Sequence, residues 1–126
     1  MMNKTEEKIE YISLLSRFHV EGLSLDAFSD EDQKISENVL ALAISIILRF
    51  PDDLPLPKMI PDEEGALLMS WRGRKVSLVM IKDDGTLDII IDARSDNPII
   101  HEQMPISINK FPEELLQLRR IYEEME

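Results

Sequence analysis

The stretch from Leu67 to Asp92, LLMSWRGRKVSLVMIKDDGTLDIIID, restricts the fold more than any other part of the chain. Its three apolar segments have the length of β-strands and are separated by two turn signals, Gly73–Arg74 and Asp84–Gly85. Asp-Gly is the strongest short signal for a hairpin, and glycine at the first central position also suits a two-residue turn. Two such turns predict a three-stranded antiparallel meander.

The same turns predict which side chains share a face of the sheet, because side chains alternate along a strand. With two residues in each turn, Trp71 pairs with Val76 and Met80 pairs with Ile89. We expect the core side of the sheet to carry Leu67, Met69, Trp71, Leu78, Met80, Ile89 and Ile91. We expect the second face to carry Leu68, Val79, Ile81 and Ile90, with Asp88 and Asp92 beside them.

This second face is more apolar than a sheet face that water covers, since antiparallel sheets usually alternate apolar and polar residues. Large exposed apolar patches are uncommon on monomeric proteins. A cover is therefore expected, and the sequence leaves three open: a helix or the proline-rich segment of the same chain, a second copy, or a partner protein. We expect at least one surface or edge of the sheet to be intermolecular.

The segments before the sheet predict two helices. Apolar residues recur with helical spacing over residues 5–18, with Asn3 or Thr5 as the N-cap. A second helix is predicted from a cap at Ser29 to about Phe50. This helix is apolar around most of its circumference, which is typical of a buried central helix.

The remaining segments complete an α+β fold. The proline-rich residues 51–61 are expected to cross the molecule in an extended form, because proline blocks helices and central strands. A fourth strand is expected within residues 98–108 and a last helix within 109–126, with Pro112 at its first position. The predicted fold is therefore two N-terminal helices, a four-stranded antiparallel meander and a C-terminal helix, in a single domain covering residues 1–126.

Residues 35–91 resemble a loose group of small uncharacterised bacterial proteins, whose pattern begins with a helix that ends near a Leu-Pro pair. The shared pattern is Leu54–Pro55, then Pro57, a strand with Gly65 and Trp71 at its two ends, and the turn Asp84–Gly85. The group has no established activity, so the resemblance implies the α+β fold alone.

The net charge and the composition of the chain favour a cytoplasmic protein with protein partners. The formal net charge is −11 and is spread along the chain, which repels nucleic acid and membrane headgroups and attracts basic partners. The chain has no cysteine, which fits a reducing compartment. The longest apolar stretch, Val39 to Leu48, has ten residues, whereas a membrane span needs about 20. The charged N-terminal residues do not suit a signal peptide.

No motif predicts catalysis, a metal site or a cofactor. The two histidines, His19 and His101, do not form a paired metal-ligand motif, and the four glycines are too scattered for a phosphate-binding loop. Carboxylates are abundant, so a small carboxylate-based enzyme or ligand binder, using Asp88 and Asp92 for example, stays open as an alternative.

One basic cluster, Arg72, Arg74 and Lys75, lies at the tip of the first predicted hairpin. These residues could contact RNA or a phosphate, with Trp71 stacking on a base. The register places Trp71 toward the core, and the cluster lies in a strongly acidic chain. Nucleic acid is therefore not the expected partner.

The apolar second face, the acidic charge and the lack of a catalytic motif lead to one expectation. The chain is predicted to be a non-catalytic acidic module that binds, and neutralises or regulates, a basic partner protein. Antitoxins, immunity proteins and phage counter-defence inhibitors are of this type. A homodimeric accessory protein without a further partner is the other alternative.

Overall fold

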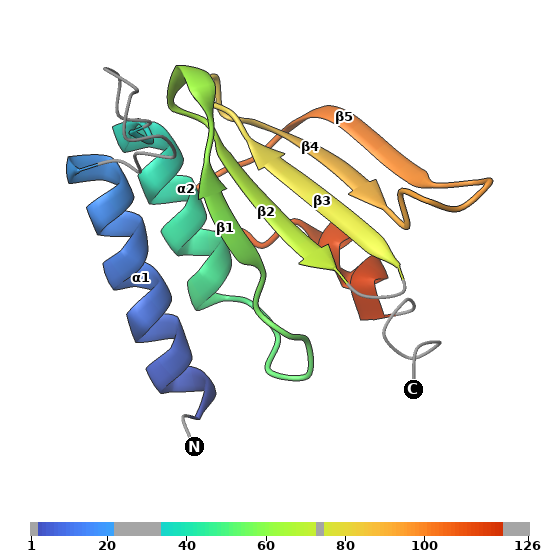
Figure 1. Ribbon diagram of the computed structural model, residues 1–126, viewed down its shortest axis with the longest axis horizontal. Helices are drawn as coiled ribbons and strands as arrows, with labels where there is room; N and C mark the ends of the chain where they lie inside the picture. The colour runs from blue at the N-terminus through green and yellow to red at the C-terminus, as the bar shows by residue number, and fades with distance from the viewer. Residues whose placement is uncertain (1–2, 22–33, 73–74, 120–126) are drawn as a thin grey trace, which may run out of the picture.

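The computed structural model describes residues 3–21, 34–72 and 75–119 (Figure 1). Five strands form one antiparallel sheet in the order β1-β2-β3-β4-β5. This architecture confirms the α+β class with an antiparallel sheet. The elements are α1 (Lys4–Val20), α2 (Glu37–Leu48), β1 (Lys58–Pro61), a 3-10 helix (Glu63–Gly65), β2 (Leu67–Arg72), β3 (Val76–Ile81), β4 (Thr86–Ile91), β5 (Ile99–Pro105) and a second 3-10 helix (Glu113–Gln117).

The sheet has one strand more than the sequence predicted, because the proline-rich segment ends in β1. This strand pairs with β2 on one side only, so it is an edge strand, where proline is tolerated. Leu54 and Met59 anchor the segment in the core with 2% and 7% of their surface exposed. The prediction of an extended crossing is confirmed for residues 58–61, which form this strand, whereas residues 51–54 form a turn closed by the Leu54 amide and the Pro51 carbonyl.

The two N-terminal helices begin at polar caps. The Asn3 side chain accepts a hydrogen bond from the Glu6 amide, which confirms the predicted cap of α1. Helix α2 is capped by Ser36 and begins at Glu37, so the prediction of helix at residues 34–36 is wrong. The predicted cap Ser29 lies outside the described residues. Residues 34–36 are not helical because the amides of Ile35 and Ser36 donate hydrogen bonds to the carbonyls of Phe18 and Gly65.

The predicted C-terminal helix is described only in its first part. That part is the 3-10 helix Glu113–Gln117, with helical residues continuing to Arg119, and residues 120–126 lie outside the described residues. The Leu115 amide bonds the carbonyl of Pro112, three residues earlier, as expected for a 3-10 turn. Leu115 and Leu118 are fully buried in the core.

The register of the meander differs by one residue from the prediction. Arg72 pairs with Val76, which leaves three residues in the first loop. In the second loop the Lys82 amide bonds the Thr86 carbonyl, which again encloses three residues. Gly85 is the last of these and has a φ of 84°, the left-handed conformation required at that place in a three-residue hairpin loop.

The longer loops exchange the two faces of β3, because a shift of one residue in the pairing register moves every side chain of a strand to the opposite face. Val79 and Ile81 point into the core, whereas Leu78 and Met80 point outward. The predicted faces are therefore wrong for this strand. They are confirmed for β2 and β4, whose core residues include Trp71 and Ile89.

The helices cover one face of the sheet. Figure 1 shows α2 passing behind the sheet with α1 beside it, and the C-terminal 3-10 helix on the same side. One hydrophobic cluster joins these elements to the inner side chains of the strands. At one end of this core the ring of Phe50 stacks on Trp71, with 5.8 Å between their centroids. The indole of Trp71 donates a hydrogen bond of 2.8 Å to the carbonyl of Pro55.

Candidate docking surface

Six apolar side chains form a continuous surface on the side of the sheet away from the helices. The register places Ile60 opposite Leu68 and Leu68 opposite Met80, and it places Ile90 opposite both Leu78 and Ile100. Directly opposed side chains in an antiparallel pair touch, so the surface crosses all five strands. We call it the outer face: Ile60, Leu68, Leu78, Met80, Ile90 and Ile100.

The outer face lies outside the core. None of its six residues belongs to the hydrophobic core cluster or packs against it. Ile100 has 51% of its surface exposed, and the other five are half-buried by their neighbours in the sheet. No helix within the described residues covers this face, so helix cover, which the sequence left open, is not present there.

Three of the six residues predicted for this face lie on it or beside it. Leu68 and Ile90 are part of the outer face and Asp88 lies beside it, while Asp92 follows the end of β4. The prediction is wrong for Val79 and Ile81, because both are fully buried among core residues and cannot touch a partner. Leu78 and Met80 replace them, and only the loop length distinguishes the two pairs.

Asp88 and Asp92 each serve the local structure. The Asp88 carboxylate lies 3.2 Å from the Lys82 amine and accepts a 2.8 Å hydrogen bond from the Gln103 amide. That bond holds the irregularity between β4 and β5, where Gln103 has a φ of 50°. Asp92 pairs with Lys75 at 3.9 Å. The two carboxylates are therefore held by different lysines.

The basic residues predicted at the tip of the first hairpin differ in their contacts. Arg72 is exposed at the end of β2. Lys75 is engaged with Asp92, and Arg74 lies outside the described residues. The structure therefore does not present three free cations as one patch within the described residues.

The outer face ends in an acidic hollow near the loop between β3 and β4. We call its four carboxylates, Asp62, Glu64, Asp83 and Asp84, the acidic end. The Thr86 hydroxyl donates a 2.6 Å hydrogen bond to Asp84, which lowers the pKa of that carboxyl below its ordinary value. Asp84 is therefore ionised at neutral pH. The hollow has a volume of about 580 Å³ and is lined by Asp62, Glu64, Ala66, Met80, Lys82, Asp83 and Asp84.

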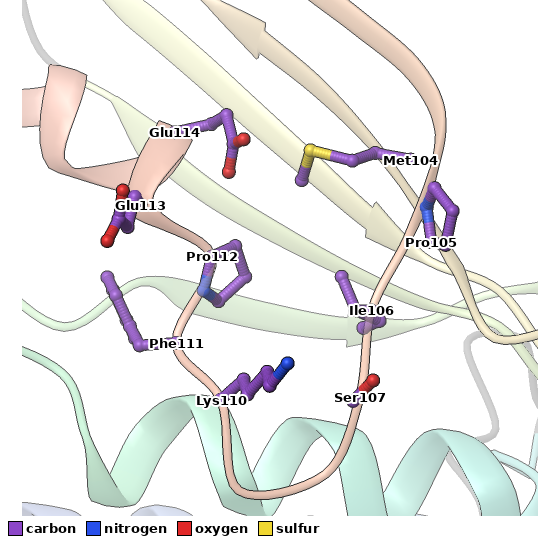
Figure 2. A pocket seen from close by; sticks show the side chains of 9 residues that line it. All are labelled: Met104, Pro105, Ile106, Ser107, Lys110, Phe111, Pro112, Glu113 and Glu114. Atoms are coloured by element: carbon purple, nitrogen blue, oxygen red, sulfur yellow. The ribbon is translucent and has the colours of Figure 1, made fainter.

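A second hollow lies between β5 and the C-terminal 3-10 helix. Figure 2 shows Met104 extending toward Glu114, with Pro112 and Ile106 between them and the loop. It encloses about 490 Å³ and is lined by Met104, Pro105, Ile106, Ser107, Lys110, Phe111, Pro112, Glu113 and Glu114. The lining mixes apolar groups with both signs of charge, so it indicates no particular ligand.

The histidines belong to the framework. His19 Nδ1 lies 2.9 Å from the carbonyl of Ile35, and His101 Nε2 lies 3.2 Å from the side-chain oxygen of Gln117. Within residues 3–21, 34–72 and 75–119, no group of three or more His, Cys, Asp or Glu side chains is arranged to hold a metal ion. Among the helices of these ranges, none combines the length and apolarity required to traverse a bilayer.

Comparisons with protein-family models, with curated proteins and with solved structures found no significant match. The resemblance to the group of small bacterial proteins therefore stays a prediction. The function has to be argued from the surface of this chain.

Proposed function

We propose that the chain is a non-catalytic module that binds a basic partner protein through the outer face and thereby neutralises or regulates it. The observation that carries this proposal is the continuous apolar surface across five strands, uncovered by any described helix. Burial of apolar surface gives roughly 25 cal/mol per Å² and is the main source of affinity in protein association. A surface of this kind gains most from a cover supplied by another molecule.

The acidic end supports a partner with positive charge. Met80 belongs to both the outer face and the acidic hollow, so one bound surface would meet apolar and acidic groups together. The formal net charge of −11 adds a long-range attraction for basic proteins. Such attraction raises the rate of association and falls as salt is added. The proposal includes antitoxins, immunity proteins and counter-defence inhibitors, and the charge of the chain does not distinguish them.

A second candidate is a homodimer through the same face. Lys58 and Arg72 lie at the end of the outer face away from the acidic end. Two copies stacked with their strands antiparallel would bring these cations toward the carboxylates of the other copy. Sedimentation of the purified chain separates the two candidates. The main proposal expects a monomer, whereas the second candidate expects a dimer. In that case a Met80→Glu variant should sediment as a monomer.

Met80→Glu should weaken partner binding without unfolding the chain. The new carboxylate would lie in the middle of the docking surface, where it faces desolvation and the acidic end. The partner is recovered at low salt with the tagged protein, from the cells that naturally produce it. We expect its affinity for the variant to be at least about tenfold lower than for the wild type, which corresponds to 1.4 kcal/mol. The melting temperature should change little, because Met80 points outward.

The matched control is Ile108→Glu. Ile108 is as exposed as Ile100, at 50% against 51%, but it lies beyond β5 and outside the sheet. This variant should bind the partner as the wild type does. Equal binding by wild type and Met80→Glu, or equal loss in both variants, would argue against docking through the outer face.

A further inference from the structure

A third cavity lies at the end of the outer face opposite the acidic end. It has a volume of about 440 Å³ and is lined by Pro55, Leu56, Lys58, Ser70, Trp71 and Arg72. Lys58 on β1 is directly opposite Ser70 on β2, and Arg72 follows two residues later on the same face of β2. Opposed side chains start about 5 Å apart, so these three polar residues are neighbours.

The hydroxyl of Ser70 has no hydrogen-bond partner among the described residues. The residue is 3% exposed, and its oxygen is buried. Buried hydroxyl groups without a partner are rare, because each loses its hydrogen bonds to water and gains none in return. Since Ser70 lines the cavity, rotation of its side chain would let the hydroxyl donate a hydrogen bond to a ligand there.

Within the described part of the chain, the two cations beside Ser70 have no partner either. The side chains of Lys58 and Arg72 are exposed and make no hydrogen bond or ion pair with any described residue. Lys82 and Lys75, by contrast, are each paired with an aspartate. Among the described residues no carboxylate lines this cavity, although the chain has 25 acidic and 14 basic residues. Its local charge is therefore opposite to that of the whole protein.

One wall of the cavity is fixed in advance. The carbonyl of Pro55 accepts the 2.8 Å hydrogen bond from the indole of Trp71, and this indole is stacked on Phe50 in the core. These contacts hold Pro55 and Leu56 beside the two cations. A wall that is already ordered does not lose conformational freedom when a ligand binds.

We propose that this cavity binds a small oxyanion joined to an apolar group, either a phosphate monoester or a carboxylate. The guanidinium of Arg72 can donate two parallel hydrogen bonds to such a group. Lys58 adds a second positive charge, and the Ser70 hydroxyl donates a third hydrogen bond. The apolar part of the ligand lies against Leu56 and Pro55. This site does not depend on the proposed docking of a partner protein, and either can fail alone.

Titrations followed by ¹H–¹⁵N NMR of the whole chain test the site. The probes are phenyl phosphate and benzoate, with inorganic phosphate and acetate as matched anions without an aromatic ring. We expect saturable shifts of the amides of Ser70 and Arg72, and a Kd at least about tenfold lower for one aromatic probe than for its matched anion. The tighter of the two aromatic probes identifies phosphate or carboxylate as the favoured group.

Variants show whether the named residues hold the anion. Arg72→Gln and Lys58→Gln should each raise the Kd of the tighter probe about tenfold or more, and Lys34→Gln, which removes an exposed lysine ahead of α2, should not. Ser70→Ala should weaken binding while the unfolding midpoint stays constant or rises, because it removes an unpaired buried hydroxyl. Linear, unsaturated shifts with every probe, or equal Kd values in Arg72→Gln and Lys34→Gln, would overturn the proposal.

Discussion

Val79→Asp should remove most of the protein's stability at room temperature, whereas Leu78→Asp should remove little of it. Val79 is fully buried in the core, so its replacement places a carboxylate without a partner in an apolar interior. The expected loss is more than about 4 kcal/mol, which approaches the whole stability of a domain of this size. Leu78 is half-buried on the outer face, where the new carboxylate reaches water. The expected loss there is under about 1.5 kcal/mol.

Urea unfolding followed by circular dichroism measures both variants. The comparison is sharp because the residues are adjacent in one strand and receive the same new side chain. Two-residue turns would reverse the order of the two losses, since they would place Leu78 inside and Val79 outside. A stable Val79→Asp protein together with an unfolded Leu78→Asp protein would therefore refute the three-residue loops.

Trp71→Ala should cost about 3–5 kcal/mol. The substitution removes a large buried side chain, its stack on Phe50 and its hydrogen bond to Pro55. The remaining carbonyl of Pro55 loses its partner, and the segment that leads to β1 loses its attachment to the core. The free energy of unfolding from urea titration gives the measurement, and a loss below about 1 kcal/mol would show that the indole does not organise this end of the core.

Trp71→Phe separates the two contributions of the indole. The aromatic ring remains available to stack on Phe50, but the donor to the carbonyl of Pro55 is lost. We expect a loss of about 1–3 kcal/mol, the usual cost when a polar group loses its partner. A loss as large as that of Trp71→Ala would assign the whole effect to the hydrogen bond.

The sequence predicted the strands of the meander but not the length of its loops. Asp84–Gly85 reads equally well as the centre of a two-residue turn and as the end of a three-residue loop, because glycine takes a positive φ in both. The pattern of β3 does not resolve this choice, since Val79 and Ile81 are as apolar as Leu78 and Met80. Where both faces of a strand are apolar, the periodicity of two identifies the strand but not its inner face.

Long-range hydrogen bonds account for the differences in the helices. The extended backbone at residues 34–36 depends on carbonyls of Phe18 and Gly65, which lie in other parts of the chain. No local pattern reveals such partners. The cap at Asn3 was predictable because its bond to Glu6 lies within one turn of helix.

Of the two candidate sites, local sequence patterns predicted part of the outer face but not the oxyanion cavity. Alternation in β2 and β4 was enough to predict a second apolar face that includes Leu68 and Ile90. The oxyanion cavity was not predictable, because the neighbourhood of Lys58 and Ser70 exists only when β1 pairs with β2. Because proline argues against a central strand, no strand was predicted at residues 58–61. Proline is tolerated there because β1 is an edge strand.

Site-specific photo-crosslinking tests the docking surface most directly. A photoreactive phenylalanine derivative is placed at Ile100 on the outer face or at Ile108 beyond the sheet, two positions of nearly equal exposure. In the cells that naturally produce the protein, we predict one discrete adduct with a basic protein from position 100 and none from position 108. No adduct from position 100, or the same adducts from both positions, would contradict the account, and an adduct with a second copy of the chain would replace the partner protein with the homodimer.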